Sequence, residues 1–84
     1  MDIRELISFC HTARLSSVSQ AARLSDLGQP TVTAHLQRLE QDIGATLFDR
    51  NRRPIKLTPQ GHKLYELTGP LVLSVERGLT SLNN

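Results

Sequence analysis

Apolar side chains recur three and four positions apart in three segments before residue 44. The segments cover residues 2–14, a short stretch that opens at Ser17, and residues 29–43. This spacing puts apolar side chains on one face of a helix, so the pattern predicts three helices around a shared core. The side chains expected on the inner faces are Ile3, Leu6, Ile7, Phe9, Cys10, Ala13, Val18, Ala21, Ala22, Val32, Leu36, Leu39 and Ile43.

Polar and special residues mark the ends of these segments. Asp2 with Glu5, and Ser17 with Gln20, match the capping-box pattern at a helix start. Pro30 suits the first turn of the third helix, where its missing N–H is not needed. The cap of that helix is either Gly28 or Gln29, and Gly44 is a helix stop.

The pattern changes after Gly44. Residues 46–50 and 54–58 are short runs with bulky or β-branched apolar side chains, separated by Asn51, Arg52 and Arg53. This texture predicts a two-stranded hairpin with a basic tip, and Pro54 should lie at a strand end or on an edge.

A long last helix is predicted from Pro59, with Thr58 as its N-cap. Pro70 removes the hydrogen bond to the Glu66 carbonyl and should kink or break this helix. The apolar ridge along this helix is longer than the core of so small a domain can cover. This favours packing against a second copy over packing within its own domain. The predicted dimerisation residues are Leu64, Leu67, Leu71, Val75, Leu79 and Leu82.

The predicted fold is mainly α. Residues 1–58 form a winged helix-turn-helix with three helices and a small two-stranded wing, and residues 59–84 form a linker or dimerisation helix. In such a fold the third helix enters the major groove of DNA, and its amino end reaches the bases. The third helix has no acidic residue before Glu40, as a surface facing phosphates requires. Its candidate DNA-binding residues are Gln29, Pro30, Thr31, Thr33, Ala34, Gln37 and Arg38.

The charge distribution adds a second candidate surface. The net charge is only +2 over 84 residues, yet no acid interrupts the basic residues between Arg50 and Tyr65. Such a block on a near-neutral domain indicates an anionic partner touched at one place, or a loop kept soluble by its arginines. For DNA, the wing at residues 50–54 would lie on the backbone or in the minor groove through Arg50, Arg52 and Arg53. Arg50 could instead pair with Asp49 or a helix end.

Other classes of function find little support. No apolar run approaches the ~18 residues that span a bilayer, so no membrane is expected. The single Cys10 allows no internal disulfide, which favours the cytoplasm. His11, His35 and His62 have no zinc-site spacing relative to Cys10, and no phosphate-binding glycine loop is present. We therefore expect no enzyme, no cofactor and no metal. The alternative is a winged helix that binds protein, which would not require the basic tip.

Several motifs occur in one order along the chain. They are Ala21-Ala22, Gln29-Pro30, Arg38-Leu39-Glu40, Gly44, Leu47-Phe48, Arg50, Leu57-Thr58 and Gly61. With them, the chain resembles the N-terminal DNA-binding domain of a LysR-type transcriptional regulator from about residue 3 to residue 67.

The resemblance implies a homodimer joined through the long last helix. It implies that this dimer binds double-stranded DNA with two-fold related half-sites. The recognition helices would lie in successive major grooves and the wings on the flanking minor grooves. Gln29, Pro30, Thr31 and Thr33 would match contacts of the recognition helix, and Arg53 the wing-tip contact. Family members are usually longer, with a C-terminal domain for a small-molecule inducer, which is not expected within these residues.

Some positions depart from the family pattern. Gly28 replaces the usual serine, and Ala34 stands where an arginine is frequent, so one DNA contact is expected to be absent. Ser25 stands where a leucine is usual, which predicts a shifted second helix or a different core contact. Arg52 and Pro54 replace wing glycines, which makes the tip stiffer and more basic.

Overall fold

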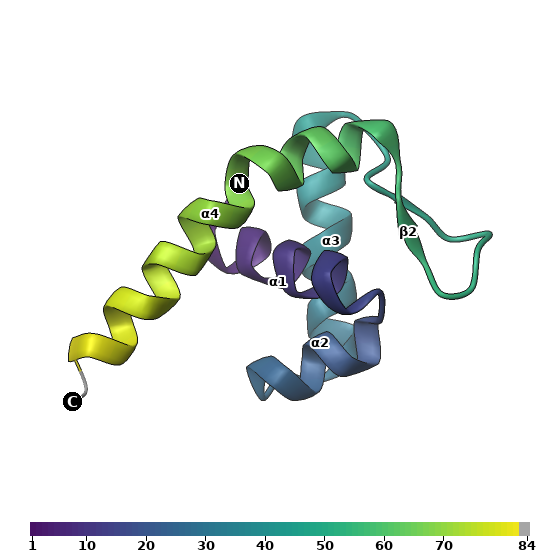
Figure 1. Ribbon diagram of the computed structural model, residues 1–84. Coiled ribbons are helices and arrows are strands. Elements are labelled where there is room, and N and C mark those ends of the chain that lie inside the picture. Colours follow the sequence, from purple (N-terminus) through teal and green to yellow (C-terminus); the bar gives the residue numbers. More distant parts are fainter. Residues whose placement is uncertain (83–84) are drawn as a thin grey trace.

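The computed structural model describes residues 1–82 and contains the elements in the predicted order. Three helices come first, then a two-stranded wing, then one long helix (Figure 1). Residues 83–84, which belonged to the predicted last helix, lie outside the described residues. The elements are α1 (Ile3–Leu15), α2 (Val18–Ser25), α3 (Gln29–Ile43), β1 (Phe48–Asp49), β2 (Lys56–Leu57) and α4 (Pro59–Leu82).

The helix starts follow the predicted N-caps, although neither Gln20 nor Glu5 returns the reciprocal side-chain bond of a capping box. The Asp2 carboxylate accepts a hydrogen bond from the Arg4 amide at 2.7 Å, and the Ser17 hydroxyl accepts one from the Gln20 amide at 3.1 Å. The capping box predicted at Asp2 is wrong, because Glu5 turns away from it. The Glu5 side chain lies 3% exposed and its Oε1 has no hydrogen-bond partner.

Two left-handed residues turn the chain around α3. Asp26 ends α2 with φ +56°, and its neighbour Leu27 donates its amide proton to the Ala22 carbonyl at 2.9 Å. Gly28 is the N-cap of α3 and, having no side chain, supplies no capping hydrogen bond. Gly44 ends α3 with φ +78°, a conformation that favours glycine. The turn from Asp26 to Gly28 thus joins α2 and α3 as a helix-turn-helix, and the turn at Gly44 leads to the wing.

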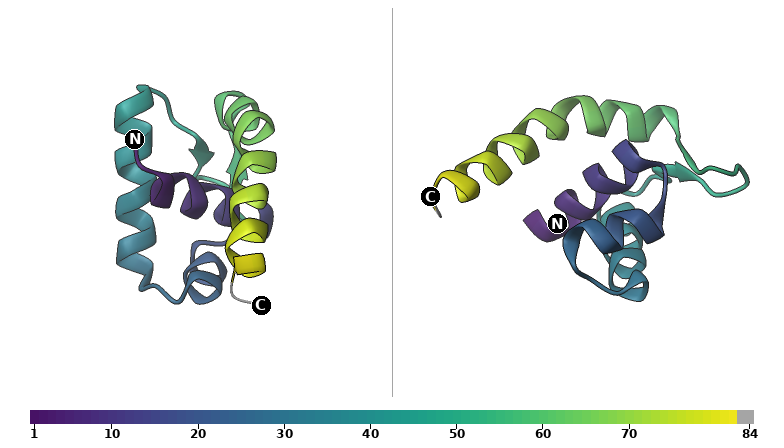
Figure 2. Two further views of the ribbon diagram at one scale, coloured as in Figure 1. Left: turned by 90° about the vertical axis from the view of Figure 1, so that its left-hand side faces the viewer. Right: turned by 60° about the horizontal axis from the view of Figure 1, so that its bottom comes forward.

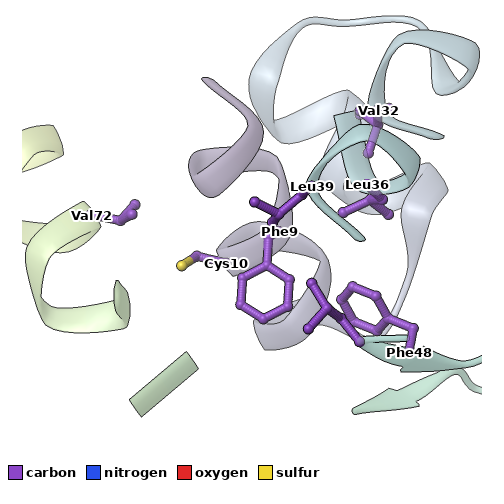
Figure 3. Packing of buried hydrophobic residues seen from close by; sticks show 9 residues of the cluster. Phe9, Cys10, Val32, Leu36, Leu39, Phe48 and Val72 are labelled. Atoms are coloured by element: carbon purple, nitrogen blue, oxygen red, sulfur yellow. The ribbon is translucent and has the colours of Figure 1, made fainter. Parts of the chain in front are cut away.

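The core lies where α1, α3, β1 and α4 meet (Figure 3). Phe9 is its centre: its ring lies 5.5 Å from the Phe48 ring and 6.4 Å from the Tyr65 ring, between centroids. The small side chain of Ala22 lets α2 approach the same cluster. The buried members are Phe9, Cys10, Ala22, Val32, Leu36, Leu39, Leu47, Phe48 and Val72.

Two residues predicted for the core are exposed. Ile3 is 50% exposed and Ile43 is 37% exposed. Ile3 is the first residue of α1 and Ile43 the last of α3, so each extends past the elements that cover the rest of its face. The periodicity identified the correct faces but not where the covering elements end.

The wing is shorter than predicted. β1 and β2 pair antiparallel over two residues each, with Phe48 opposite Leu57 and Asp49 opposite Lys56. The residues between the strands form a loop that projects from the body of the molecule (Figure 1). At its base the Thr58 hydroxyl donates to the Thr46 carbonyl at 2.6 Å and accepts from the Gly61 amide at 3.0 Å, so it caps α4 as predicted.

α4 continues through Pro70 without breaking. Its axis changes direction along its length, and the second half leans away from the wing (Figures 1 and 2). Proline lacks the N–H for one helical bond, which accounts for a bend at this point. The prediction of a kink or a break is therefore resolved as a bent, continuous helix.

Candidate nucleic-acid interface

α3 has one buried and one exposed face. Val32, Leu36 and Leu39 point into the core, which fixes the opposite face toward solvent. Every predicted contact residue on α3 is exposed: Gln29, Pro30, Thr31, Thr33, Ala34, Gln37 and Arg38. The structure thus brings these residues together on one accessible surface, as the sequence predicted.

The chemistry of the exposed amino end of α3 suits an anionic ligand. No acidic residue lies in its first turn, where Gln29 offers an amide and Thr31 a hydroxyl and a methyl group. The positive end of the helix dipole adds to the attraction for anions. Of the two candidates for the cap, the structure identifies Gly28, whose missing side chain leaves the approach to this end open.

A groove of about 380 Å³ lies beside this end of α3. Gln29 of α3, Ser17 and Ser19 at the start of α2, and Arg53 of the wing contribute to its walls. The Ser17 and Ser19 hydroxyls lie 3.1 Å apart. The sequence analysis did not name either serine as a candidate DNA-binding residue. Their capping position was visible in the sequence, but their closeness to the wing depends on tertiary packing.

The wing tip carries two arginines that are held differently. Arg52 is 65% exposed, and its Nε lies 3.4 Å from Asp49 Oδ2, the acid at the end of β1. Arg53 donates from Nη1 to the backbone carbonyls of Arg50 and Arg52, at 3.1 and 3.3 Å. These bonds hold the Arg53 guanidinium against the turn, so a cationic group is fixed at the tip.

Arg50 lies at the base of the wing. Its Nη2 lies 3.0 Å from Glu40 Oε1 and its Nη1 lies 3.2 Å from Glu40 Oε2. Glu40 Oε2 also accepts the Leu47 amide at 2.7 Å. Of the two pairings considered from the sequence, the one with Asp49 is wrong and the one with a helix end is confirmed, because Glu40 lies in the last turn of α3. This paired fork joins the wing to α3.

Arg38 lies farther along α3. Its side chain is 69% exposed, and Nη1 lies 4.0 Å from Oε2 of the buried Glu5 on α1. At this distance the pair is at the limit of an ion pair, so Arg38 retains its donors for an external partner. Gln37 and Ala34 precede it on the same exposed surface.

Cys10 and His35 both take part in the packing of the fold. Burial raises the pKa of the Cys10 thiol, which keeps it protonated at neutral pH. His35 Nδ1 lies 2.7 Å from the Ser8 hydroxyl, an arrangement that fastens α3 to α1. Among residues 1–82, no three histidine, cysteine or acidic side chains gather as a metal site would require.

α4 exposes an apolar stripe on the side away from the core. Leu67 is 71% exposed and Leu71 is 66% exposed, and Val75, Leu79 and Leu82 are exposed beyond them. Leu64, predicted for the same ridge, lies half-buried against the core of its own domain. Val72 is fully part of that core. Across the described residues, no helix has the length and apolar character needed to cross a membrane.

A protein-family model, described as "Bacterial regulatory helix-turn-helix protein, lysR family", matches residues 3–62. The chain is 34% identical over 76 residues to the HTH-type transcriptional regulator YtlI of Bacillus subtilis, covering 90% of this chain and 24% of that protein. It is 32% identical over 77 residues to the regulator BenM of Acinetobacter baylyi, covering 92% of this chain and 25% of that protein. The chain thus spans about a quarter of the length of these curated relatives.

Solved structures show the same fold. The BenM_DBD/catB site 1 DNA complex superposes with a TM-score of 0.86 at 30% identity, covering 99% of this chain and 92% of that one. Vibrio fischeri DarR in complex with DNA gives a TM-score of 0.83 at 32% identity, covering 99% of this chain and 28% of that one. The winged helix-turn-helix with a long last helix is therefore confirmed as the fold.

Proposed function

Because the chain belongs to the LysR family of bacterial regulatory helix-turn-helix proteins, we propose that it binds duplex DNA sequence-specifically as the DNA-binding domain of a transcriptional regulator. The relatives found are transcriptional regulators and not enzymes, which agrees with the absence of a reactive centre predicted from the sequence. Two similar solved structures are complexes with DNA, which supports the proposal.

The observation that carries the proposal is the meeting of three surfaces on one side of the molecule. They are the acid-free amino end of α3, the groove between α2 and the wing, and the arginine tip. A helix about 10–12 Å across fits a major groove about 12 Å wide. With α3 in that groove, the wing reaches the neighbouring stretch of backbone or minor groove.

The side chains then divide by role. Gln29 and Thr31 read base edges, since an amide can pair with adenine and a threonine methyl can contact thymine. Pro30, Thr33, Ala34, Gln37 and Arg38 line the surface against the groove wall, where hydroxyl, amide and guanidinium groups bind phosphates. Arg52 and Arg53 bind the backbone or the minor groove. Arg50, paired with Glu40, positions the wing.

We further propose that two copies join through α4. Residues 1–58 form the DNA-binding unit, and the helix from residue 59 onward carries the exposed stripe of Leu67, Leu71, Val75, Leu79 and Leu82. A two-fold dimer buries this stripe against itself and presents two α3 helices to two-fold related half-sites. A cytoplasmic location and a small-molecule inducer bound by a further domain complete the proposal for the whole regulator.

The rival function is a winged helix that binds a protein partner with the same face of α3. Affinity for duplex DNA as a function of salt concentration separates the two. A DNA-binding dimer should lose affinity steeply, with a log–log slope near −0.9 for each phosphate contacted. A flat salt response, or no affinity for any duplex, would favour the rival.

A further inference from the structure

His11 is a buried histidine that the proposed DNA contacts leave unused. It lies on α1 with 4% of its surface exposed, and both ring nitrogens have partners on other helices. Nδ1 lies 2.9 Å from the Ser25 hydroxyl, and Nε2 lies 2.9 Å from Glu76 Oε2. Ser25 is the last residue of α2, and Glu76 is on α4 beyond Pro70. One imidazole therefore joins the helix-turn-helix to the second half of α4.

The protons on the imidazole are assigned by its partners. An ionised carboxylate can only accept, so Nε2 donates to Glu76 and, in the neutral ring, Nδ1 accepts from the Ser25 hydroxyl. Each ring nitrogen therefore has a matched partner, so the imidazole ties α2 to α4.

The hydrogen bond from His11 to Glu76 influences the direction of the second half of α4 because of its position along the helix. Beyond Pro70, the first point held to the body is Val72, which belongs to the buried core. Glu76 lies one turn farther and, among residues 1–82, makes the one side-chain hydrogen bond from this half of α4 to another helix. Because α4 bends at Pro70, its second half can tilt relative to the first, and the contact at Glu76, one turn beyond Val72, fixes its direction.

A small tilt of the second half of α4 would change how the two α3 helices are placed on DNA. From Pro70 to Leu82 the helix extends about 18 Å at 1.5 Å per residue. A tilt of about 10° moves its far end by about 3 Å, which is close to the 3.4 Å rise of one base pair. If α4 carries the dimer contact, this displacement changes the separation of the two α3 helices.

We propose that His11 is a positioning residue: through Ser25 and Glu76 it sets the direction of α4 and thereby the spacing between half-sites that the dimer accepts. This inference rests on the proposed function, a DNA-binding dimer joined through α4. It assigns to His11 a part in selecting the operator although His11 is buried away from the DNA-reading face.

The test uses duplexes with two identical half-sites separated by spacers that differ by single base pairs. The chain with Glu76→Ala loses the tie without opening the core, because this side chain is 35% exposed. We expect the affinity ratio between the best spacer and its neighbours to fall by roughly 2- to 30-fold, the range typical of coupling mutations. Base preference within a half-site should stay unchanged.

Three matched variants sharpen the test. Glu76→Gln keeps an amide oxygen that accepts from Nε2 and should retain the wild-type spacing profile, whereas Ser25→Ala breaks the other bond and should broaden it. Glu66→Ala, an exposed glutamate on the same helix before Pro70, should change nothing. Thermal unfolding of each variant confirms that it is folded.

The outcomes separate the two levels of the proposal. An unchanged spacing profile in folded Glu76→Ala, with wild type showing a sharp preference, overturns the role of His11 and leaves the DNA-binding dimer standing. A wild-type chain that binds single half-sites as well as paired ones overturns the dimer, and with it the spacing role. A broadened profile in both Glu76→Ala and Ser25→Ala supports the inference.

Discussion

At the residue scale, sequence chemistry predicted which side chains are exposed on α3 but not how charged residues pair. Arg50 was a candidate DNA contact or a partner for Asp49 or a helix end, and the fold identifies Glu40, in the last turn of α3, as its partner. The unusual Ser25 has a similar explanation: its hydroxyl bonds to His11, a polar contact where a leucine is usual in the family. Pairings between residues far apart in sequence depend on packing, which a local pattern does not contain.

Replacing Arg53 by alanine should weaken DNA binding across all sequences. Its guanidinium is held at the wing tip, so removing one phosphate contact should flatten the log–log salt slope by about one unit. Fluorescence anisotropy at several salt concentrations measures both quantities. The matched control is Arg77→Ala, an exposed arginine on α4, and an equal effect of the two variants would contradict the wing assignment.

Replacing Thr31 by alanine should instead change specificity. Loss of its hydroxyl and methyl groups should alter the preference at one or two base pairs of each half-site by roughly 1–3 kcal/mol. Competition binding to a panel of single-base variants of a selected site reports this directly. The control is Gln41→Ala, at the far end of α3, which should leave the affinities for all the variant sites unchanged. The same unchanged affinities for Thr31→Ala would show that Thr31 makes no base contact.

At the element scale, the sequence predicted the order of helices and strands, most of their ends and the buried faces of α2 and α3. Caps at Asp2, Ser17 and Thr58 are local signals, which explains why they were recognised. The exposed ends at Ile3 and Ile43, the short strands and the core position of Val72 were missed. Each of these depends on where a neighbouring element stops, which periodicity does not report.

Gly61 shows how two elements depend on one residue. A Cβ added there would overlap the Leu47 carbonyl oxygen, so Gly61→Ala should force α4 away from the wing. We expect this variant to lose a few kcal/mol of unfolding free energy, as severe overpacking does.

A second helical glycine of α4, Gly78, provides the control. Nothing lies within 4 Å of a Cβ at Gly78, so Gly78→Ala should be neutral or should stabilise the helix by up to about 1 kcal/mol. Urea unfolding followed by circular dichroism measures both variants. Equal stabilities for the two would show that α4 does not pack on Leu47 as closely as described.

At the scale of the whole molecule, a single copy of the chain leaves the apolar stripe on α4 uncovered. Leu71→Glu places a charge in its middle and should shift the chain to monomer, with a matching loss of affinity for paired half-sites. Sedimentation velocity checks the mass. Leu73→Glu, an exposed leucine on another side of α4, should remain dimeric, and a dimeric Leu71→Glu would contradict the proposed interface.

The central claim is that the amino end of α3 enters the major groove while the wing tip holds the adjacent backbone. The most direct measurement is an NMR titration of the ¹⁵N-labelled chain with a duplex selected from a random pool, with amide shifts followed residue by residue. We predict the largest changes at residues 28–34, at the start of α2 and at residues 50–54. Changes confined to other surfaces, with residues 28–34 unaffected at saturation, would contradict the account.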